Sequence, residues 1–189
     1  MLTELQDLPQ WVVWRAEIDH EGKKKKAPYN PLYHLVRSSV KNPQSWGTLK
    51  EALTALETGN YSGIGLMLAP PLVFLDLDDC FDGVTDTISD PKAATVVEEI
   101  NSYTEVSPSG RGLHILCYGR LLGNGIHSNT IEMYGKDRFT TITTDHLVGT
   151  PNTIEERQDV ITTLYKQYAP SVVPEIIQNT RGWLGVVTI

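Results

Sequence analysis

The sequence predicts an α+β protein in which antiparallel sheets are flanked by helices. Short apolar runs rich in Val, Ile, Phe and Thr recur along the chain between turn residues, which is typical of β-strands. Three other segments carry apolar residues at helical spacing and begin at capping residues. A chain of 189 residues is long enough for one domain or one compact pair of lobes.

The composition is that of an ordinary globular protein, with 40% apolar and 21% charged residues. A net charge of −7 argues against nucleic-acid binding through overall charge, so any such binding must use a local basic patch. Cys80 and Cys117 have no metal-binding spacing, which indicates free buried thiols, a reducing compartment and a cytoplasmic location. We find no signal peptide and no apolar run of about 18 residues, so no membrane partner is expected.

Residues 1–70 are expected to form an N-terminal α/β lobe. Its strands are expected at residues 10–18, within 23–29 and at 62–68. The intervening helix begins with a capping box of Thr48 and Glu51 and ends at Gly59. Residues 23–26 are four consecutive lysines, which form either a solvated hairpin tip or a site that attracts phosphate.

Residues 71–168 are expected to form a second lobe that carries the chemistry. Its main strands are expected at residues 72–78, 113–118, 130–135 and 138–143. We predict two hairpins at this stage. A turn at residues 69–71 would pair strand 62–68 with strand 72–78, and a turn at residues 136–137 would pair strand 130–135 with strand 138–143.

Two amphipathic helices are expected in this second lobe. One is capped by Asp90 and opened by Pro91. The other is capped by Asn152 or Thr153 and reaches residue 168. Residues 169–189 resemble a linker or the start of a following region.

Acidic residues occur inside a strand that is otherwise built to be buried. Asp76 and Asp78 alternate along this strand, so both are expected on one face with Cβ atoms about 6.6 Å apart. This spacing suits two carboxylates that flank divalent metal ions. Alternatively, the strand ends here and the aspartates cap a loop in water. Asp79 is expected to face away or to begin the turn, and its loss should be tolerated.

A polar turn leads into the strand at residues 113–118. The turn carries Ser107, Ser109 and Arg111, whose hydroxyls and charge can hold phosphate oxygens, and small residues such as Gly112 let a ligand approach the backbone. His114 stands directly after it. A histidine at the start of a buried strand is either a hydrogen-bonded structural residue or, beside this turn, a phosphate ligand.

A further acid, Glu132, lies in the next apolar strand, and Tyr134 shares its face. Glu132 is either paired with Arg138 across the predicted hairpin or acts as a third carboxylate at a metal site. In the second case Arg138 is free to bind phosphate.

Together these signals resemble the archaeo-eukaryotic primase superfamily, above all the primase-polymerase domains of phages and plasmids. The motifs that carry the resemblance are, in chain order, Asp76-Leu77-Asp78, Gly112-Leu113-His114 and Glu132. The likeness covers about residues 10–168. It departs from the pattern in having Glu132 where many relatives carry Asp, and we find no zinc-binding or helicase motif.

The resemblance implies the archaeo-eukaryotic primase fold, with an RRM-like antiparallel sheet core in the second lobe and a catalytic domain over residues 1–168. It implies two Mg²⁺ or Mn²⁺ ions held by Asp76, Asp78 and Glu132. It also implies that a nucleoside triphosphate is held by His114, Ser107, Ser109, Arg111, Gly112 and Arg138.

The expected activity is template-directed nucleotidyl transfer, as a DNA polymerase or primase in replication of a mobile element. Single-stranded or primed DNA and dNTPs or NTPs are the expected partners, with a helicase region in a longer chain. The lysines at residues 23–26, with Arg15 and Lys41, are expected to contact the template. Two alternatives stay open: a metal-dependent nuclease with His114 as general base, and a non-catalytic nucleic-acid-binding module.

Overall fold

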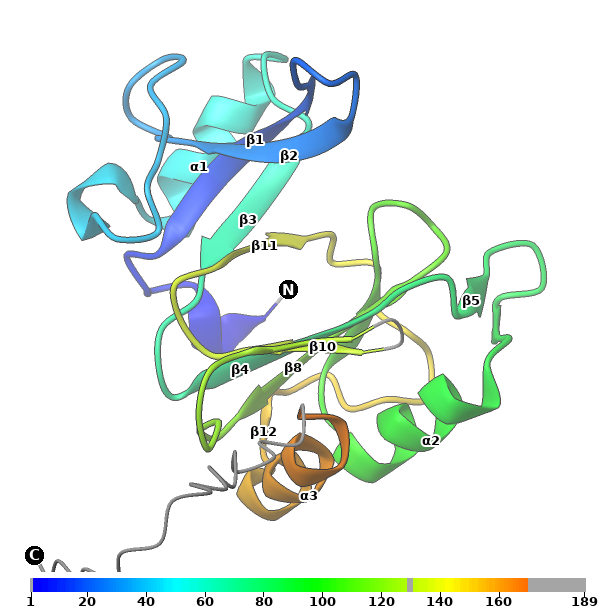
Figure 1. Ribbon diagram of the computed structural model, residues 1–189. Helices are drawn as coiled ribbons and strands as arrows, with labels where there is room; N and C mark the ends of the chain where they lie inside the picture. The colour runs from blue at the N-terminus through cyan, green and yellow to red at the C-terminus, as the bar shows by residue number, and fades with distance from the viewer. Residues whose placement is uncertain (1, 129–130, 170–189) are drawn as a thin grey trace, which may run out of the picture.

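The computed structural model describes residues 2–128 and 131–169, and arranges them as two main sheets and three α-helices (Figure 1). The first sheet has the strand order β11-β3-β1-β2, and the second has the order β12-β8-β4-β10-β9 with β7 also paired to β8. The predicted α+β class is confirmed. Residue 130 of the predicted strand and residues 170–189 of the predicted linker lie outside the described residues.

The first sheet lies in the upper lobe of Figure 1. It consists of β1 (Trp11–Ile18), β2 (Lys24–Tyr29), β3 (Gly63–Met67) and β11 (Phe139–Ile142), all antiparallel. The helix α1 (Leu49–Glu57) packs against it through a shared apolar core. The predicted capping box is confirmed, because the Thr48 hydroxyl accepts from the Glu51 N–H and the Glu51 carboxylate accepts from the Thr48 N–H at 2.7 Å.

The second sheet forms the lower lobe, and its strands are antiparallel except for the parallel pair of β12 and β8. Its strands are β4 (Leu72–Leu77), β7 (Thr104–Val106), β8 (Leu113–Tyr118), β9 (Ile126–His127), β10 (Glu132–Tyr134) and β12 (Glu155–Glu156). Three small elements complete the description: the 3-10 helices η1 (Thr3–Leu5) and η2 (Pro43–Ser45), and the short hairpin of β5 (Phe81–Asp82) and β6 (Thr87–Ile88).

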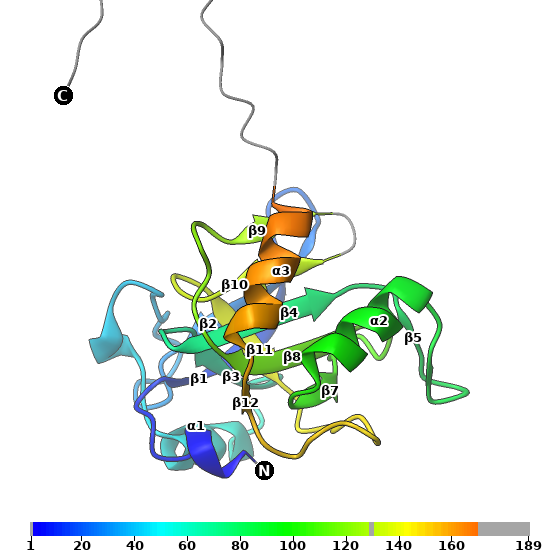
Figure 2. The ribbon, with the colours of Figure 1, turned by 90° about the horizontal axis from the view of Figure 1, so that it is seen from below.

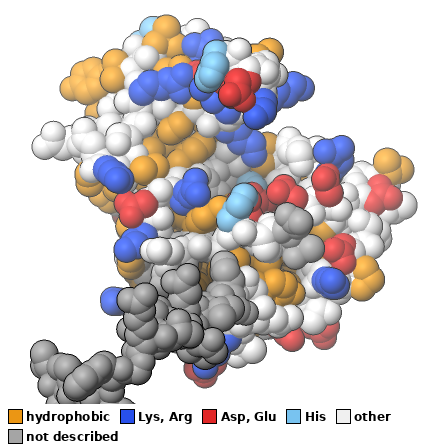
Figure 3. Space-filling view, viewed as in Figure 1, with side chains coloured by type: hydrophobic (Ala, Val, Ile, Leu, Met, Phe, Trp, Pro, Cys, Tyr) orange, Lys and Arg blue, Asp and Glu red, His pale blue; other side chains and the backbone are white. Residues whose placement is uncertain are grey.

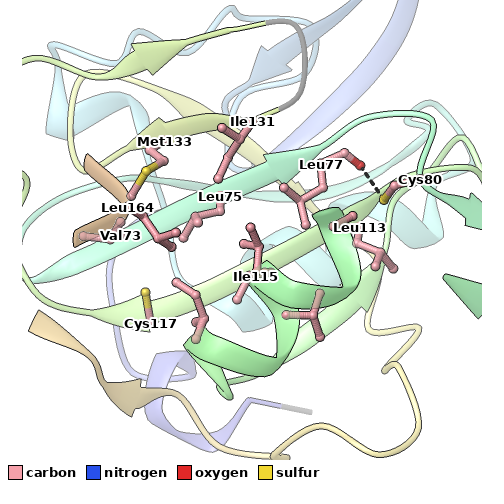
Figure 4. Close-up of a cluster of buried hydrophobic side chains, with 14 of the residues drawn as sticks. Val73, Leu75, Leu77, Cys80, Leu113, Ile115, Cys117, Ile131, Met133 and Leu164 are labelled. Atoms are coloured by element: carbon pink, nitrogen blue, oxygen red, sulfur yellow. Dashed lines mark hydrogen bonds between the residues drawn. The ribbon is translucent and has the colours of Figure 1, made fainter. Parts of the chain in front are cut away.

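Two helices cover one face of the second sheet (Figure 2). They are α2 (Pro91–Ile100), which Asp90 caps as predicted, and α3 (Gln158–Tyr168). Alternation along β4 directs Val73, Leu75 and Leu77 into the core beneath these helices (Figure 4). The intervening residues of β4 therefore point to the opposite face, toward the first lobe. The thiols of Cys80 and Cys117 are free and buried in this core, as predicted.

Both predicted hairpins that flank the site are wrong. β3 lies in the first sheet and β4 in the second, and likewise β10 lies in the second sheet and β11 in the first. Residues 68–71 and 135–138 are therefore crossings between the lobes. They run side by side, because the Leu68 N–H donates to the Arg138 carbonyl at 2.9 Å. An apolar pattern identifies a strand but does not identify its partner when both faces are buried.

The start of the last helix also differs from the prediction. α3 begins at Gln158, and the hydroxyl of Thr153 bonds Glu155 of β12 instead of capping a helix. Arg157 precedes the helix, and its guanidinium donates to the carbonyls of Ile100 and Asn101 at the end of α2. The residues that match a capping box belong to β12 and the segment before it, so the sequence placed the start of the helix too early.

No helix within the described residues is long and apolar enough to cross a membrane.

Candidate active site

Five ionisable side chains lie in one row across the second sheet, each on a different strand. The row runs through Glu105 (β7), His114 (β8), Asp76 (β4), Glu132 (β10) and His127 (β9). Directly paired residues point to the same face of a sheet, so this row lies opposite the face that α2 and α3 cover. Asp76, Glu132 and His114 were predicted from the sequence, and the structure brings these three together.

Glu105 is a fully buried carboxylate that the sequence did not identify as functional. It accepts hydrogen bonds from the backbone N–H groups of Thr143 at 2.9 Å and Thr144 at 3.0 Å, and from the Tyr103 hydroxyl at 3.1 Å. Its Oε1 also lies 3.3 Å from Nδ1 of His114. A buried carboxylate with this many partners is held rigidly, so it fixes the orientation of the imidazole ring.

His114 is itself buried, and the edge of its ring packs against Phe74 with 5.0 Å between ring centroids. With Nδ1 directed at Glu105, the other ring nitrogen faces Asp76, and Nε2 lies 3.8 Å from Oδ1 of that residue. This separation is too long for a hydrogen bond but short enough for electrostatic attraction. His114 therefore has a structural partner on one side and a polar site on the other.

Asp76 is only 27% exposed, and its pKa is raised above the ordinary value. Burial is the main cause, and the negative charges of Asp78 and Glu132 raise the pKa further. His114 and Lys26 act in the opposite direction but do not cancel the effect. Ionising the Asp76 carboxyl in this buried position is costly, and a bound cation relieves that cost.

The sequence predicted that Asp78 lies on the same strand as Asp76, and this prediction is wrong. β4 ends at Leu77, and Asp78 is exposed in the turn that follows. Asp79 continues this turn with φ at 48°, a conformation that Asp and Asn adopt more readily than most residues, so its predicted place at the turn is confirmed. The carboxylate of Asp79 pairs with Arg111 at 3.2 Å, and both side chains are exposed.

Glu132 is held by Tyr134 and His127, not by Arg138. The Tyr134 hydroxyl donates to Oε2 of Glu132 at 2.8 Å, while Nδ1 of His127 contacts Oε1. Among the described residues, no ion pair joins Glu132 to Arg138, so the predicted structural alternative is not observed. The Arg138 guanidinium instead lies 4.5 Å from the centroid of the Tyr134 ring. Burial and the bond to Glu132 raise the pKa of Tyr134 to about 12.

The turn that was predicted to bind phosphate folds back on itself. The hydroxyls of Ser107 and Ser109 are 2.9 Å apart, and the Ser109 hydroxyl accepts from the Arg111 N–H at 3.2 Å. The turn lies beside the one at Asp79, because the Phe81 N–H donates to the Arg111 carbonyl. Its hydroxyls and Arg111 therefore sit at the end of β4, outside the main cleft described below.

Gly112 permits a close contact at the start of β8. A Cβ atom at this position would lie 2.7 Å from the carbonyl oxygen of Leu77 and 3.2 Å from the Ser107 hydroxyl. We expect Gly112→Ala to destabilise the fold by about 1–3 kcal/mol, since the backbone of β4 would have to move. Urea unfolding followed by circular dichroism would measure this, and an unchanged midpoint would contradict it.

A cleft of about 640 Å³ lies between the two lobes over the ionisable row. Figure 3 shows the hollow between the lobes, with basic side chains on its upper side and acidic ones below. The second lobe contributes Phe74, Asp76, His114, Glu132 and Tyr134, the first lobe contributes Lys24, Lys25 and Lys26 of β2, and Arg138 to Thr141 complete the lining. Of the predicted site residues, Asp76, His114, Glu132 and Arg138 line this cleft.

The donor chemistry of the cleft fits a hard divalent cation. Asp76 and Glu132 are directly paired on adjacent strands, so their carboxylates project from the same face of the sheet, and Asp78 is near enough for its charge to affect Asp76. Within residues 2–128 and 131–169, however, no three His, Cys, Asp or Glu side chains already converge as a metal site. Glu132 is engaged by His127 and Tyr134, so metal binding there requires a side-chain rearrangement.

Comparison with known proteins finds one informative relative. The chain is 37% identical over 142 residues to a DNA primase-polymerase of Nitratiruptor phage NrS-1. The matched region covers 71% of this chain but only 19% of the relative. No protein-family model matches the sequence.

Proposed function

Because the chain contains a domain of the phage primase-polymerase type, we propose that it is a template-directed nucleotidyltransferase that extends a primer on a DNA template. The second sheet with its two covering helices takes the part of the RRM-like catalytic core of the archaeo-eukaryotic primase fold. Replication of a mobile element is the proposed setting. Because the matched region is a small part of its relative, a helicase region in a longer chain is proposed on the same basis.

The observation that carries this proposal is the row of Asp76, Glu132 and His114 on the floor of a cleft whose opposite wall is basic. Two carboxylates on adjacent strands, facing a lysine-rich strand, suit a substrate that carries both phosphate and metal. Asp76, Asp78 and Glu132 are the proposed ligands of Mg²⁺ or Mn²⁺. Such ions, when bound, stabilise the negative charge that develops on phosphate oxygens during nucleotidyl transfer.

The other residues of the cleft have roles that follow from their positions. Lys24, Lys25 and Lys26 of β2 line the cleft, the charge of Lys26 acts on Asp76, and these lysines attract the phosphates of nucleotide or DNA. His114 donates from Nδ1 to Glu105, and its Nε2 faces the site, where the protonated ring donates to a phosphate oxygen. Arg138 at the side of the cleft neutralises charge on the leaving pyrophosphate. Ser107, Ser109 and Arg111 lie near Asp78 and are proposed to close around the nucleotide when it binds.

The test is primer extension on a labelled primer–template with dNTPs and either Mn²⁺ or Mg²⁺. We expect templated extension that disappears when the metal is chelated. Products formed without dNTPs, by shortening of the strands, would instead identify a metal-dependent nuclease. Binding of DNA with neither extension nor cleavage would identify a non-catalytic module.

The lysines of β2 supply a separate prediction. The double variant Lys24→Ala and Lys26→Ala is expected to weaken binding of primed DNA and to lower the slope of log K against log salt by up to about two units, because each lysine contacts about one phosphate. Fluorescence anisotropy at several salt concentrations measures the slope.

Lys23→Ala is the matched control for this experiment. Lys23 belongs to the same run of lysines but pairs with Glu21 at 2.8 Å and does not line the cleft. It should leave the slope unchanged. Equal effects of both variants would show that the lysine run acts only through its overall charge.

A further inference from the structure

The cleft over the ionisable row is named the acidic cleft after its floor. A second cleft, of about 450 Å³, adjoins it at Tyr134 and Arg138, which line both clefts. It lies between the loop that follows β8 and the crossing from β10 to β11. Its charged lining residues are Arg120, Lys136, Arg138 and Asp137, with His127 at the border to the acidic row. Of these charged residues, only Arg138 has a role in the proposed function.

The charge of the second cleft is opposite to that of the lobe around it. Residues 68–169 contain seven basic and fifteen acidic side chains. Three of the seven basic side chains, but only one of the fifteen acidic ones, line this cleft. Such a concentration of positive charge in an acidic lobe favours an anionic ligand.

The loop that carries Arg120 is fixed in place by α3. The Gln158 side chain accepts from the Arg120 N–H at 2.8 Å and donates to the Arg120 carbonyl at 3.0 Å. The Tyr165 hydroxyl donates to the Asn124 carbonyl at 2.8 Å. The shape of the cleft is thus set by hydrogen bonds before any ligand arrives, which lowers the entropic cost of binding.

Glycine residues bring this loop close to its neighbours and leave backbone accessible. A Cβ atom on Gly125 would lie 2.6 Å from the Tyr134 ring, and one on Gly123 would lie 2.7 Å from the Tyr165 hydroxyl. Gly119 and Gly135 also line the cleft. Glycine-rich backbone beside basic side chains is suited to phosphate groups, which accept hydrogen bonds from N–H groups.

The connection to the acidic cleft indicates what kind of phosphate ligand fits. Tyr134 bonds Glu132 through its hydroxyl and carries the Arg138 guanidinium over its ring, so these two residues join the two clefts. A ligand with a phosphate at the acidic row can continue past Arg138 to Arg120 and Lys136. A nucleic-acid strand carries one phosphate per nucleotide and so supplies further phosphates in that direction, whereas a nucleoside triphosphate is the competing ligand that the test below separates.

We propose that the second cleft binds the sugar–phosphate backbone of the DNA strand that enters or leaves the acidic cleft. This proposal rests on the proposed function, because it takes the acidic cleft as the place where a strand is extended. Arg120 and Lys136 contact phosphates and not bases, so the contact is independent of sequence.

The test uses the double variant Arg120→Ala and Lys136→Ala, with Lys92→Ala, an exposed lysine that lines neither cleft, as the control. Arg138 is left intact because it serves both clefts. Binding of a fluorescein-labelled primer–template is measured by anisotropy at several salt concentrations, and the KM for dNTPs is measured by primer extension. We expect the double variant to raise Kd for DNA about tenfold or more and to lower the salt slope by about two units, with KM for dNTPs unchanged.

A raised KM for dNTPs with an unchanged Kd for DNA would overturn the proposal and make the second cleft a nucleotide site. No change in either quantity would also overturn it.

The outcome is separable from that of the proposed function. A wild-type chain that extends no primer, yet binds DNA through Arg120 and Lys136, refutes the activity and supports the cleft. Normal extension with unaltered DNA binding in the double variant refutes the cleft alone.

Discussion

Replacing Asp76 with Asn is expected to reduce nucleotidyl transfer by at least about a hundredfold while the protein remains folded. Asp76 occupies the centre of the ionisable row and is paired in register with both His114 and Glu132. Asn keeps the size of the side chain but removes the charge that is proposed to hold a cation. Primer extension under saturating Mn²⁺ measures the loss, and retention of full activity would refute the site.

Asp79→Asn is the matched control for this substitution. It removes a carboxylate three residues away in the chain, and Asn tolerates the positive φ of this position. Because Asp79 is exposed and pairs only with Arg111 among the charged side chains of the described residues, we expect activity to be retained. A loss comparable with that of Asp76→Asn would mean that the whole acidic turn binds the metal.

The same Asp76 variant should gain thermal stability in the absence of metal. The pKa of the Asp76 carboxyl is raised in the folded state. The stability that this group contributes is therefore fully present below its ordinary pKa and is lost as pH rises through the raised value. Asn removes this loss at neutral pH. The wild-type Tm should rise on addition of Mn²⁺, whereas the Tm of the variant should start higher and respond less.

Glu105→Gln is expected to lower kcat by about 10- to 100-fold, with a smaller change in the KM for nucleotides. The amide can accept at only one of the two oxygen positions, so it cannot satisfy the N–H groups of Thr143 and Thr144 and the His114 ring together. The ring then loses its fixed orientation. Steady-state primer extension separates kcat from KM.

Tyr103→Phe provides the control for Glu105. It removes one hydrogen bond to Oε2 and leaves the contact between Oε1 and His114 in place. This variant should lose up to about 1.5 kcal/mol of stability and little of kcat. If both variants lower kcat in proportion to their loss of stability in urea, Glu105 supports the fold and does not position His114.

Of the candidate site residues, the sequence predicted Asp76 and His114 in long strands and Glu132 in a short one, but it missed Glu105 and His127. Asp76 and His114 lie in six-residue strands whose apolar alternation is clear. Glu105 lies in a strand of three residues and His127 in one of two, which are too short for a periodic signal. The one hint that Glu105 is buried in a strand was its position between Thr104 and Val106, which are both β-branched. Asp78 was misplaced because the strand ends one residue earlier than its composition suggests.

The helices α1 and α2 were predictable because capping and amphipathic spacing are local properties of the chain. Strand pairing was not, because it depends on contacts between distant segments. Thr143 and Thr144 donate to Glu105 across 38 and 39 residues of sequence, and no local pattern specifies such contacts. The cleft and its basic wall follow from the same long-range arrangement.

The paired crossings between the lobes determine how this protein can be divided. β11, from residues 139–142, is an edge strand of the sheet that residues 11–67 otherwise supply, so the upper lobe is assembled from two separate stretches of sequence. A fragment that stops near residue 70 would expose the open edge of β3, which invites association with other strands. Recombination or truncation at that boundary should therefore yield aggregates, while cuts in the exposed loop at residues 83–86 should be tolerated.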